Sequence, residues 1–361
     1  MKEQLYKSPL NKMVRTSITD LWNDSCSVAE LKYAIEHGAV GATSNPLIVG
    51  EVLGKEMHVW KNRIKDIIQE NPIATDDELT WQVIEEISVK AAELLLPIFK
   101  REEGKKGRLS IQTDPKCYRN SERMVSQAVH FNNLAANIIV KLPVTRAGVE
   151  AIEEATYQGV SINATVCFSV SQALAVGEAV ENGLGRREKE GKDTSRMGPV
   201  CTIMVGRVDD WLKVLADRDD IVTNPSCLEW AGVAVMKKAY ELFKKSGYRA
   251  RLLSAASRNH MHWSEFIGGD VVVTLTHQWQ RRFNACDVEV IPRMDTPVEP
   301  WIIEELKNKF EDFRHAYEPD GLGLHEFDTF GPTVRTLRQF IGGYERLVSS
   351  IRDLMLPNPD I

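Results

Sequence analysis

The stretch Asn137-Ile-Ile-Val-Lys-Leu-Pro-Val-Thr145 decides how the rest of the chain is interpreted. Its apolar, β-branched residues are typical of a parallel strand that is buried on both faces. Lys141 interrupts this run, although leaving water disfavours a charged ammonium group. Desolvation lowers the pKa of a lysine, and a neutral amine can attack a carbonyl to form a Schiff base. The local sequence also allows, and on its own favours, an amine that reaches solvent or pairs with a carboxylate.

Seven further segments share this strand-like character and alternate with amphipathic helical patterns. The eight predicted strands are Ser17–Trp22, Val40–Asn45, Arg108–Asp114, Asn137–Pro143, Val160–Ser169, Pro199–Val205, Arg251–Ala256 and Val271–Leu275. Strict alternation predicts a parallel sheet, and eight repeats within about 260 residues have the length of a (β/α)8 TIM barrel. A doubly wound open sheet is the competing fold, but no glycine-rich phosphate loop follows the first strand.

Two segments fall outside this repeat. Gly185–Arg196 is highly charged and flanked by glycine, which indicates a solvated surface loop before the sixth strand. After about residue 290 the pattern becomes helical, over Pro300–Tyr317 and Pro332–Leu356. We expect one domain over 1–361, with a barrel at about 16–290 and a C-terminal helical extension at about 291–361 packed on it.

Composition narrows the class of protein. The 361 residues are 43% hydrophobic and 27% charged, with a net charge of −6, which is typical of a soluble globular protein and argues against a nucleic-acid partner. No apolar run reaches about 18 residues, so we expect no membrane span. The first residues, Met1–Lys7, have no apolar stretch of signal-peptide length. Six scattered cysteines favour reduced thiols in a cytoplasmic protein over disulfides or a zinc site.

Polar residues follow or end most of the predicted strands. In a (β/α)8 barrel the C-terminal strand ends carry the active site. The candidates there are Asp20, Asn45, Gln112, Lys141, Asn163, Thr165, Thr202, Arg207 and Arg258. A ring of this composition suits carbonyl chemistry on a polyhydroxylated, phosphorylated substrate. His260 and His262 form an HxH pair, but no third ligand is identifiable, so we expect no metal site.

Six short motifs occur in order along the chain, each on or next to a predicted strand. They are Ile18-Thr-Asp20, Thr43-Ser-Asn-Pro46, Val140-Lys-Leu-Pro-Val-Thr-Arg-Ala-Gly148, Ile162-Asn-Ala-Thr-Val-Cys-Phe-Ser169 with Gln172-Ala173, Val205-Gly-Arg-Val-Asp-Asp-Trp211 and Ala256-Ser-Arg-Asn259. Together they resemble the transaldolase family of Schiff-base aldol enzymes, which includes fructose-6-phosphate aldolase-like members. The charged segment and the C-terminal extension are not covered by this resemblance.

The resemblance implies a role for each candidate. Lys141 matches the lysine that attacks the ketose carbonyl, and Asp20 matches the general acid/base. Thr165 matches a hydroxyl that places the catalytic water. The other matches are substrate-binding: Asn45 and Asn163 hold hydroxyls of the dihydroxyacetone unit, Arg207 and Arg258 clamp phosphate, and Thr202 lies in the phosphate pocket. The resemblance also implies sugar-phosphate substrates, no metal or organic cofactor, and a homo-oligomer.

Simpler explanations remain open for several of these residues. Asp20 could cap a turn, and Asn163 and Thr165 could bond to backbone at a strand end. Arg207 could form a local ion pair with Asp209 or Asp210. The chain also departs from the family pattern in three ways. In two of them, Met204 replaces an aromatic residue, and Thr202 and Ala256 replace serines of the phosphate pocket.

The third and most informative departure in the active site concerns Gln112, which stands where transaldolases usually carry a glutamate. Glutamine cannot titrate, so it can orient a water but cannot shuttle protons through it. Family members that act as simple aldolases resemble this chain at that position. Three functions therefore stay open: a transferase that moves a dihydroxyacetone unit between sugar phosphates, an aldolase that releases it, and a binding protein without turnover.

Overall fold

Eight parallel strands close into a barrel in chain order in the computed structural model, which describes residues 6–357 and 359. The strands are β1 (Asp20–Asn23), β2 (Gly41–Thr43), β3 (Arg108–Gln112), β4 (Ile138–Pro143), β5 (Ile162–Cys167), β6 (Val200–Ile203), β7 (Arg251–Ser254) and β8 (Val271–Leu275). The predicted (β/α)8 barrel is confirmed, and every strand overlaps its predicted range. Residues 1–5, most of the stretch in which we expected no signal peptide, lie outside the described residues.

Helices follow the strands around the outside of the barrel. They are α1 (Pro9–Thr16), α2 (Val28–Glu36), α3 (Pro46–Glu70), α4 (Asp76–Arg101), the 3₁₀ turn η1 (Pro115–Cys117), α5 (Ser121–Asn132), α6 (Arg146–Tyr157), α7 (Val170–Lys189), α8 (Val205–Arg218), α9 (Pro225–Leu228), α10 (Ala231–Ser246), α11 (Met261–Ser264) and α12 (His277–Asn284). Nine of them are preceded by a Ser, Thr or Asn whose side chain accepts a backbone N–H of the first turn, namely α1, α2, α3, α4, α5, α6, α7, α9 and α12.

An apolar layer fills the middle of the barrel. Trp22, Ile139, Val200 and Val272 belong to one buried cluster. Each lies two residues before a polar residue, namely Asp24, Lys141, Thr202 and Thr274, and therefore on the same face of its strand. Gly41 makes room for this layer, because a Cβ there would stand 2.5 Å from the Trp22 ring. The layer separates an N-terminal mouth of the barrel from a C-terminal mouth.

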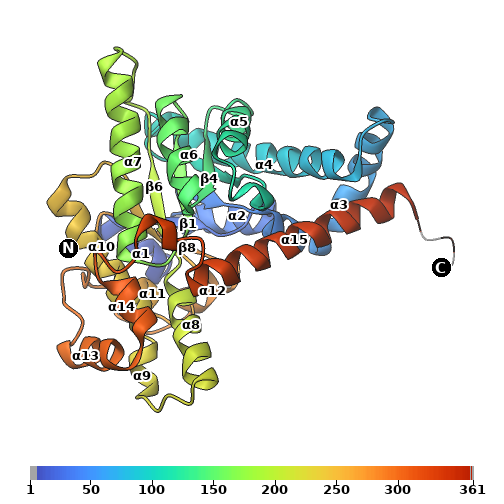
Figure 1. The fold of residues 1–361 in the computed structure, drawn as a ribbon. Coiled ribbons are helices and arrows are strands. Elements are labelled where there is room, and N and C mark those ends of the chain that lie inside the picture. The colour runs from blue at the N-terminus through green and yellow to red at the C-terminus, as the bar shows by residue number, and fades with distance from the viewer. Residues whose placement is uncertain (1–5, 358, 360–361) are drawn as a thin grey trace.

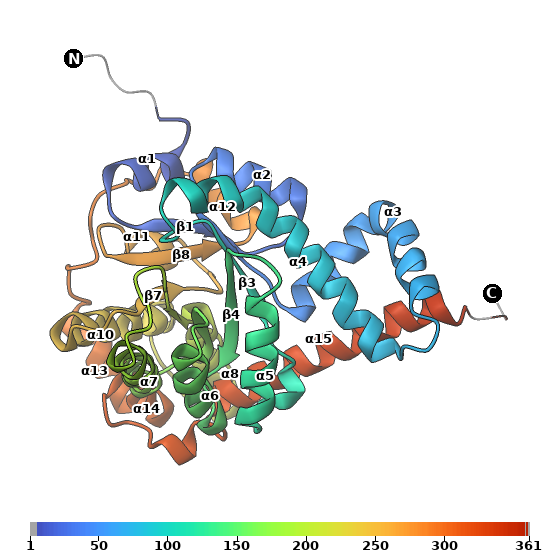
Figure 2. The same cartoon turned by 90° about the horizontal axis from the view of Figure 1, so that it is seen from above.

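The C-terminal extension is helical, as predicted, and comprises α13 (Pro300–Lys309), α14 (Glu311–Tyr317), the 3₁₀ turn η2 (Leu324–Glu326) and α15 (Gly331–Met355). Figure 1 shows α15 as a long helix running from the barrel towards α3. Its far half packs on α3 and α4, where Tyr344 donates a 2.7 Å hydrogen bond to Asp77 and Arg352 pairs with Asp76 at 2.5 Å. In Figure 2 these three helices project together from one side of the barrel.

The charged segment Gly185–Arg196 differs from the loop that we expected, because α7 continues through Lys189. Arg186 explains the longer helix: its guanidinium pairs with Glu153 at 3.2 Å and Glu154 at 2.9 Å, both on α6. The charges therefore contact a neighbouring helix, and only the residues from 190 onward form the connection to β6. Within the described part of the chain, no helix combines the length and the apolar character needed to cross a bilayer.

Candidate active site at the C-terminal mouth

Lys141 lies inside the barrel as the fourth residue of β4. Its in-register neighbours are Gln112 on β3 and Asn163 on β5, so the three side chains share one level of the barrel. The lysine is 5% exposed, and it forms no salt bridge with any described residue. Burial lowers the pKa of its amine, while the nearby Asp24 carboxylate opposes that shift. This environment favours a larger neutral, nucleophilic fraction than an exposed lysine has.

Asp24 is the carboxylate that acts on Lys141, and it directly follows β1. Its backbone N–H donates to the carbonyl of Leu275 at 2.8 Å, which ties it to the end of β8. Thr43 Oγ1 donates to Asp24 Oδ1. Asp24 was not among the site residues predicted from the sequence. Strand alternation could have found it, because Asp24 lies two residues beyond the inward-facing Trp22 at the C-terminal end of the strand.

Asp20 occupies the opposite mouth of the barrel. It is the first residue of β1, and its carboxylate binds Lys106 Nζ at 2.7 Å and Arg251 Nη1 at 2.6 Å. Arg251 is itself the first residue of β7. Our placement of Asp20 in the ring around Lys141 is therefore wrong. The reason is that β1 starts three residues later than Ser17, so Asp20 opens the strand instead of lying near its end.

Asn163 forms the centre of a buried polar chain across three strands. Its Nδ2 donates to Ser110 Oγ at 3.0 Å, and its Oδ1 accepts from Thr202 Oγ1 at 2.6 Å. Asn163 is fully buried, and Thr202 is 2% exposed. Thr202 therefore lies in the ring as predicted, but its hydroxyl proton is directed to Asn163. This leaves the remaining lone pairs and the second N–H of the amide for a ligand.

Thr165 stands at an irregularity in β5. The register between β5 and β6 shifts between Ala164 and Cys167, and Val166 has φ +58°, a left-handed conformation that is unusual for a β-branched residue. Gln172 stabilises this turn, because its Nε2 donates to the carbonyls of Val144 at 3.1 Å and Val166 at 3.3 Å. Bulges and strained residues re-aim side chains and cluster at functional sites, which fits Thr165 as a site residue.

Two amides complete the ring. Asn45 caps α3, with its Oδ1 accepting from the Ile48 N–H at 2.9 Å, and its Nδ2 donates to no described residue. Gln112 is 3% exposed, and its buried Oε1 has no hydrogen-bond partner among the described residues. A buried acceptor without a partner costs folding free energy unless a water or a ligand donates to it. Both amides thus keep capacity for a hydroxyl-bearing ligand.

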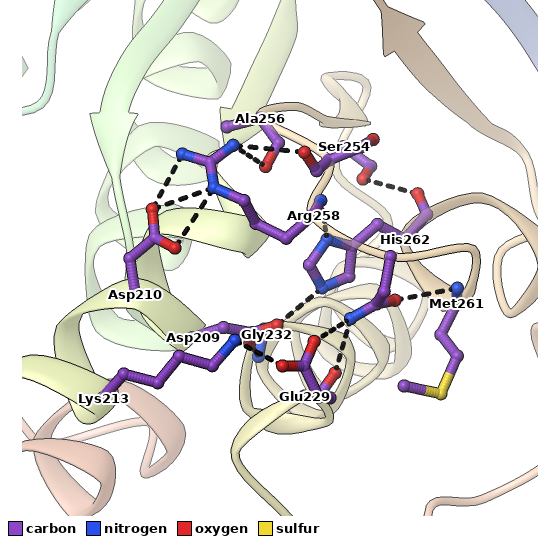
Figure 3. Close-up of polar contacts among 12 residues, drawn as sticks. Asp209, Asp210, Lys213, Glu229, Gly232, Ser254, Ala256, Arg258, Met261 and His262 are labelled. Carbon is purple, nitrogen blue, oxygen red and sulfur yellow. Dashed lines mark hydrogen bonds and ion pairs between the residues drawn. The ribbon is translucent and has the colours of Figure 1, made fainter. Parts of the chain in front are cut away.

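Arg258 is held directly by Asp210 and, through His262, by Asp209, two consecutive aspartates of α8 (Figure 3). Its guanidinium donates to Asp210, with Nη2 2.7 Å from Oδ2. Its backbone N–H donates to Nδ1 of His262 at 3.0 Å, and Nε2 of that ring lies 2.9 Å from Asp209 Oδ2. His262 and Asp209 are fully buried, and burial raises the pKa of the Asp209 carboxyl. Asp210 therefore pairs with Arg258, not with Arg207 as the sequence had allowed.

Arg207 faces the C-terminal extension. Its Nη1 donates to Thr336 Oγ1 at 3.2 Å and to Gln339, both on α15. Burial and the neighbouring Arg258 lower the pKa of its guanidinium, and Arg335 adds a third positive charge. A small cavity is lined by all three arginines. An anion would relieve the repulsion among the three arginines, so this cavity suits a phosphate group.

The fold and the buried lysine define a (β/α)8 protein whose candidate active site is the C-terminal mouth of the barrel. Comparison with known proteins leads to its family. The sequence pattern of the Transaldolase/Fructose-6-phosphate aldolase family matches residues 21–318, and the chain belongs to this family. The match begins just after Asp20 and contains Asp24, Lys141 and all the other candidates.

Several curated relatives are named transaldolase. The protein of Thiobacillus denitrificans is 31% identical over 259 residues, which cover 68% of this chain and 70% of that protein. The protein of Mycobacterium tuberculosis is 28% identical over 259 residues, which cover 68% of each chain. The protein of Thermobifida fusca is 29% identical over 211 residues, which cover 56% of each chain.

Proposed function

We propose that this protein is a transaldolase-type enzyme that transfers a dihydroxyacetone unit between sugar phosphates through a Schiff base on Lys141. The observation that carries the proposal is the buried lysine on β4, whose pKa is lowered and which has amides in register on both sides. The proposal is supported by the family and by relatives named transaldolase.

The first step is attack by neutral Lys141 Nζ on the ketose carbonyl. Loss of water then gives an iminium ion, which draws electrons from the neighbouring carbon–carbon bond. The lysine itself thus supplies the electron sink, and the proposed reaction needs neither a metal nor an organic cofactor. Gln112 lies beside Lys141 in the register, and its unpartnered Oε1 can orient the departing water.

The second step requires a base for the hydroxyl on the carbon beyond the bond that breaks. We assign this role to Asp24 in place of Asp20, because Asp24 is the carboxylate close enough to influence the lysine. It takes the hydroxyl proton as the bond cleaves and the aldehyde leaves. The lysine keeps the three-carbon enamine, which attacks the acceptor aldehyde while Asp24 returns the proton. Water then releases the product.

The remaining polar residues bind the substrate. Asn45 and Asn163 face hydroxyls of the three-carbon unit with their remaining donors and acceptors, and Thr165 places the water used in hydrolysis. Arg207 and Arg335 receive the phosphate, with Arg258 partly neutralised by Asp210. Thr202 acts through Asn163, which it holds in one orientation.

Gln112 favours a second candidate function, an aldolase that protonates the enamine and releases dihydroxyacetone. The two functions are distinguished by incubating the protein with fructose 6-phosphate, with and without an aldose-phosphate acceptor. A transferase forms product only with the acceptor. An aldolase releases dihydroxyacetone without it. Absence of turnover with any ketose phosphate, in a folded sample that also fails to form an adduct, would leave only the binding-protein hypothesis.

Three expectations stay predictions: a single domain over 1–361, a homo-oligomer and a cytoplasmic location.

A further inference from the structure

The N-terminal mouth of the barrel contains a second polar cavity, of about 590 Å³. It is lined by residues at the starts of strands and by the connections that precede them. Five cationic side chains face it: Lys105, Lys106, Arg108, Arg249 and Arg251. Its carboxylates are Asp20 and Asp270. The apolar layer around Trp22 separates this cavity from Lys141, so it is not part of the candidate active site.

Not all of these cations are neutralised. Asp20 accepts from Lys106 and Arg251, and Arg251 also contacts Asp270 at 2.8 Å. Arg249 pairs with glutamates on α7. Lys105 and Arg108 have no carboxylate partner within residues 6–357. The cavity therefore carries an excess of positive charge next to an ion-pair network that is already complete.

Arg108 is the most unusual of these residues. It is 5% exposed, and its Nη2 donates to the carbonyls of Gly104, at 2.8 Å, and Arg196. Its Nε has no hydrogen-bond partner among the described residues, and burial lowers the pKa of the guanidinium. A purely structural role in joining two loops explains the Nη2 contacts, but it leaves the buried Nε–H unsatisfied, which costs folding free energy.

Gly198 keeps space open beside this donor. A Cβ at residue 198 would stand 3.3 Å from Arg108 Nε and 3.9 Å from Nη2. Gly198 also lines the cavity. The unpartnered Nε–H of Arg108 thus faces a position where the chain has no side chain.

We propose that the N-terminal mouth binds a small phosphate monoester, with its phosphate on Arg108 and Lys105 beside Gly198. Both N–H groups of Arg108 Nη2 already donate to carbonyls, so Nε–H supplies one charge-assisted contact to a phosphate oxygen, and Lys105 adds a second positive charge. Asp20 and Asp270 stand across the cavity, where carboxylates can accept from hydroxyls of the ligand's organic part. The ligand class is a hydroxylated phosphate monoester, bound apart from the barrel's C-terminal mouth.

Calorimetric titration of the full chain with inorganic phosphate tests this site. The protein carries Arg207→Ala throughout, so that the arginine cluster at the other mouth is weakened. We expect saturable binding with a Kd of about 1 mM or tighter. Adding Gly198→Ala, which fills the space beside Arg108 Nε without changing charge, raises Kd about tenfold or more. The matched control is Gly185→Ala in α7, where a Cβ meets nothing within 4 Å, and it leaves Kd unchanged.

Lys105→Ala is the second variant, because Lys105 is exposed and its loss does not disturb packing. It raises Kd about threefold to tenfold if the lysine contributes one charged contact. Melting curves without phosphate show whether Gly198→Ala remains folded; if it does not, Lys105→Ala decides. If the heat of phosphate addition does not saturate and is the same in both variants, phosphate only screens surface charge non-specifically. That result, or an unchanged Kd in a folded Gly198→Ala and in Lys105→Ala, would overturn the proposal.

Discussion

The two mouths of the barrel use the same strand, β1, to present a carboxylate to a cation, with opposite results. At the N-terminal mouth, Asp20 forms close ion pairs with Lys106 and Arg251. At the C-terminal mouth, Asp24 acts on Lys141 without a salt bridge, and its Oδ1 is occupied by Thr43. Charges that neutralise each other stabilise the fold, whereas a lysine that is buried without a full partner has a lowered pKa and can react.

Removing each lysine gives the largest expected contrast. Lys141→Met keeps the volume of the side chain but removes the nucleophile, so ketose-phosphate turnover falls at least about a thousandfold. Lys106→Met, at the other mouth, leaves kcat within about threefold. Steady-state kinetics of the two purified variants measure the contrast. Residual activity of Lys141→Met above a thousandth of the wild type would remove the lysine from the mechanism.

The two aspartates provide the next test. Asp24→Asn removes a general base with little change in shape, and we expect kcat to fall about 10²–10⁴-fold with a small change in melting temperature. Asp20→Asn keeps kcat but loses its charge-assisted contacts, which costs about 1.5–3 kcal/mol of unfolding free energy. Kinetics and chemical denaturation of both variants separate the roles. A large loss of kcat in Asp20→Asn with retained stability would restore Asp20 as the catalytic residue.

Arg207→Ala should affect binding more than chemistry. Loss of its charged contacts raises KM for a phosphorylated ketose about tenfold to a hundredfold, while kcat changes much less. The control is Arg338→Ala. Arg338 is an exposed arginine on α15, the helix that Arg207 contacts, and its loss leaves KM unchanged. An unchanged KM in Arg207→Ala would indicate that the substrate has no phosphate at this corner.

Gln112→Glu is expected to have the smallest effect. A carboxylate beside Lys141 can shuttle protons through a water, so the ratio of transfer to simple cleavage rises about threefold to tenfold. The ratio is measured from product formed with and without acceptor aldehyde. If the ratio stays constant, the residue at this position does not decide between transferase and aldolase.

The pH dependence of the reaction sharpens the comparison further. The pKa of Lys141 is lowered in the folded protein, so the rate of adduct formation rises with pH and levels off below the value of about 10.4 for an exposed lysine. The unfolded chain binds more protons at pH values between the lowered pKa of Lys141 in the folded protein and the ordinary lysine pKa in the unfolded chain. The contribution of Lys141 to the free energy of unfolding therefore also rises with pH in that window. A plateau only above about 10.4 would contradict the lowered pKa.

The sequence was sufficient for the barrel because periodicity and strand length are local properties. It also placed Lys141, Asn163 and Thr165 inside the barrel strands, because the predicted ranges contain β4 and β5; the roles of these residues stay predictions. It misplaced Asp20 because a shift of three residues in the start of β1 moves a side chain from one mouth to the other. The pairings of Arg258 with Asp210 and of Arg207 with α15 join residues 48 and 132 positions apart, which no local pattern encodes.

The central claim is tested most directly by borohydride reduction in the presence of fructose 6-phosphate, followed by intact-protein and peptide mass spectrometry. The account predicts one reduced dihydroxyacetone adduct per chain, located on Lys141 and absent from Lys141→Met. An adduct on another lysine, such as Lys106, or a folded wild-type sample that forms none with this donor or with other ketose phosphates, would contradict it.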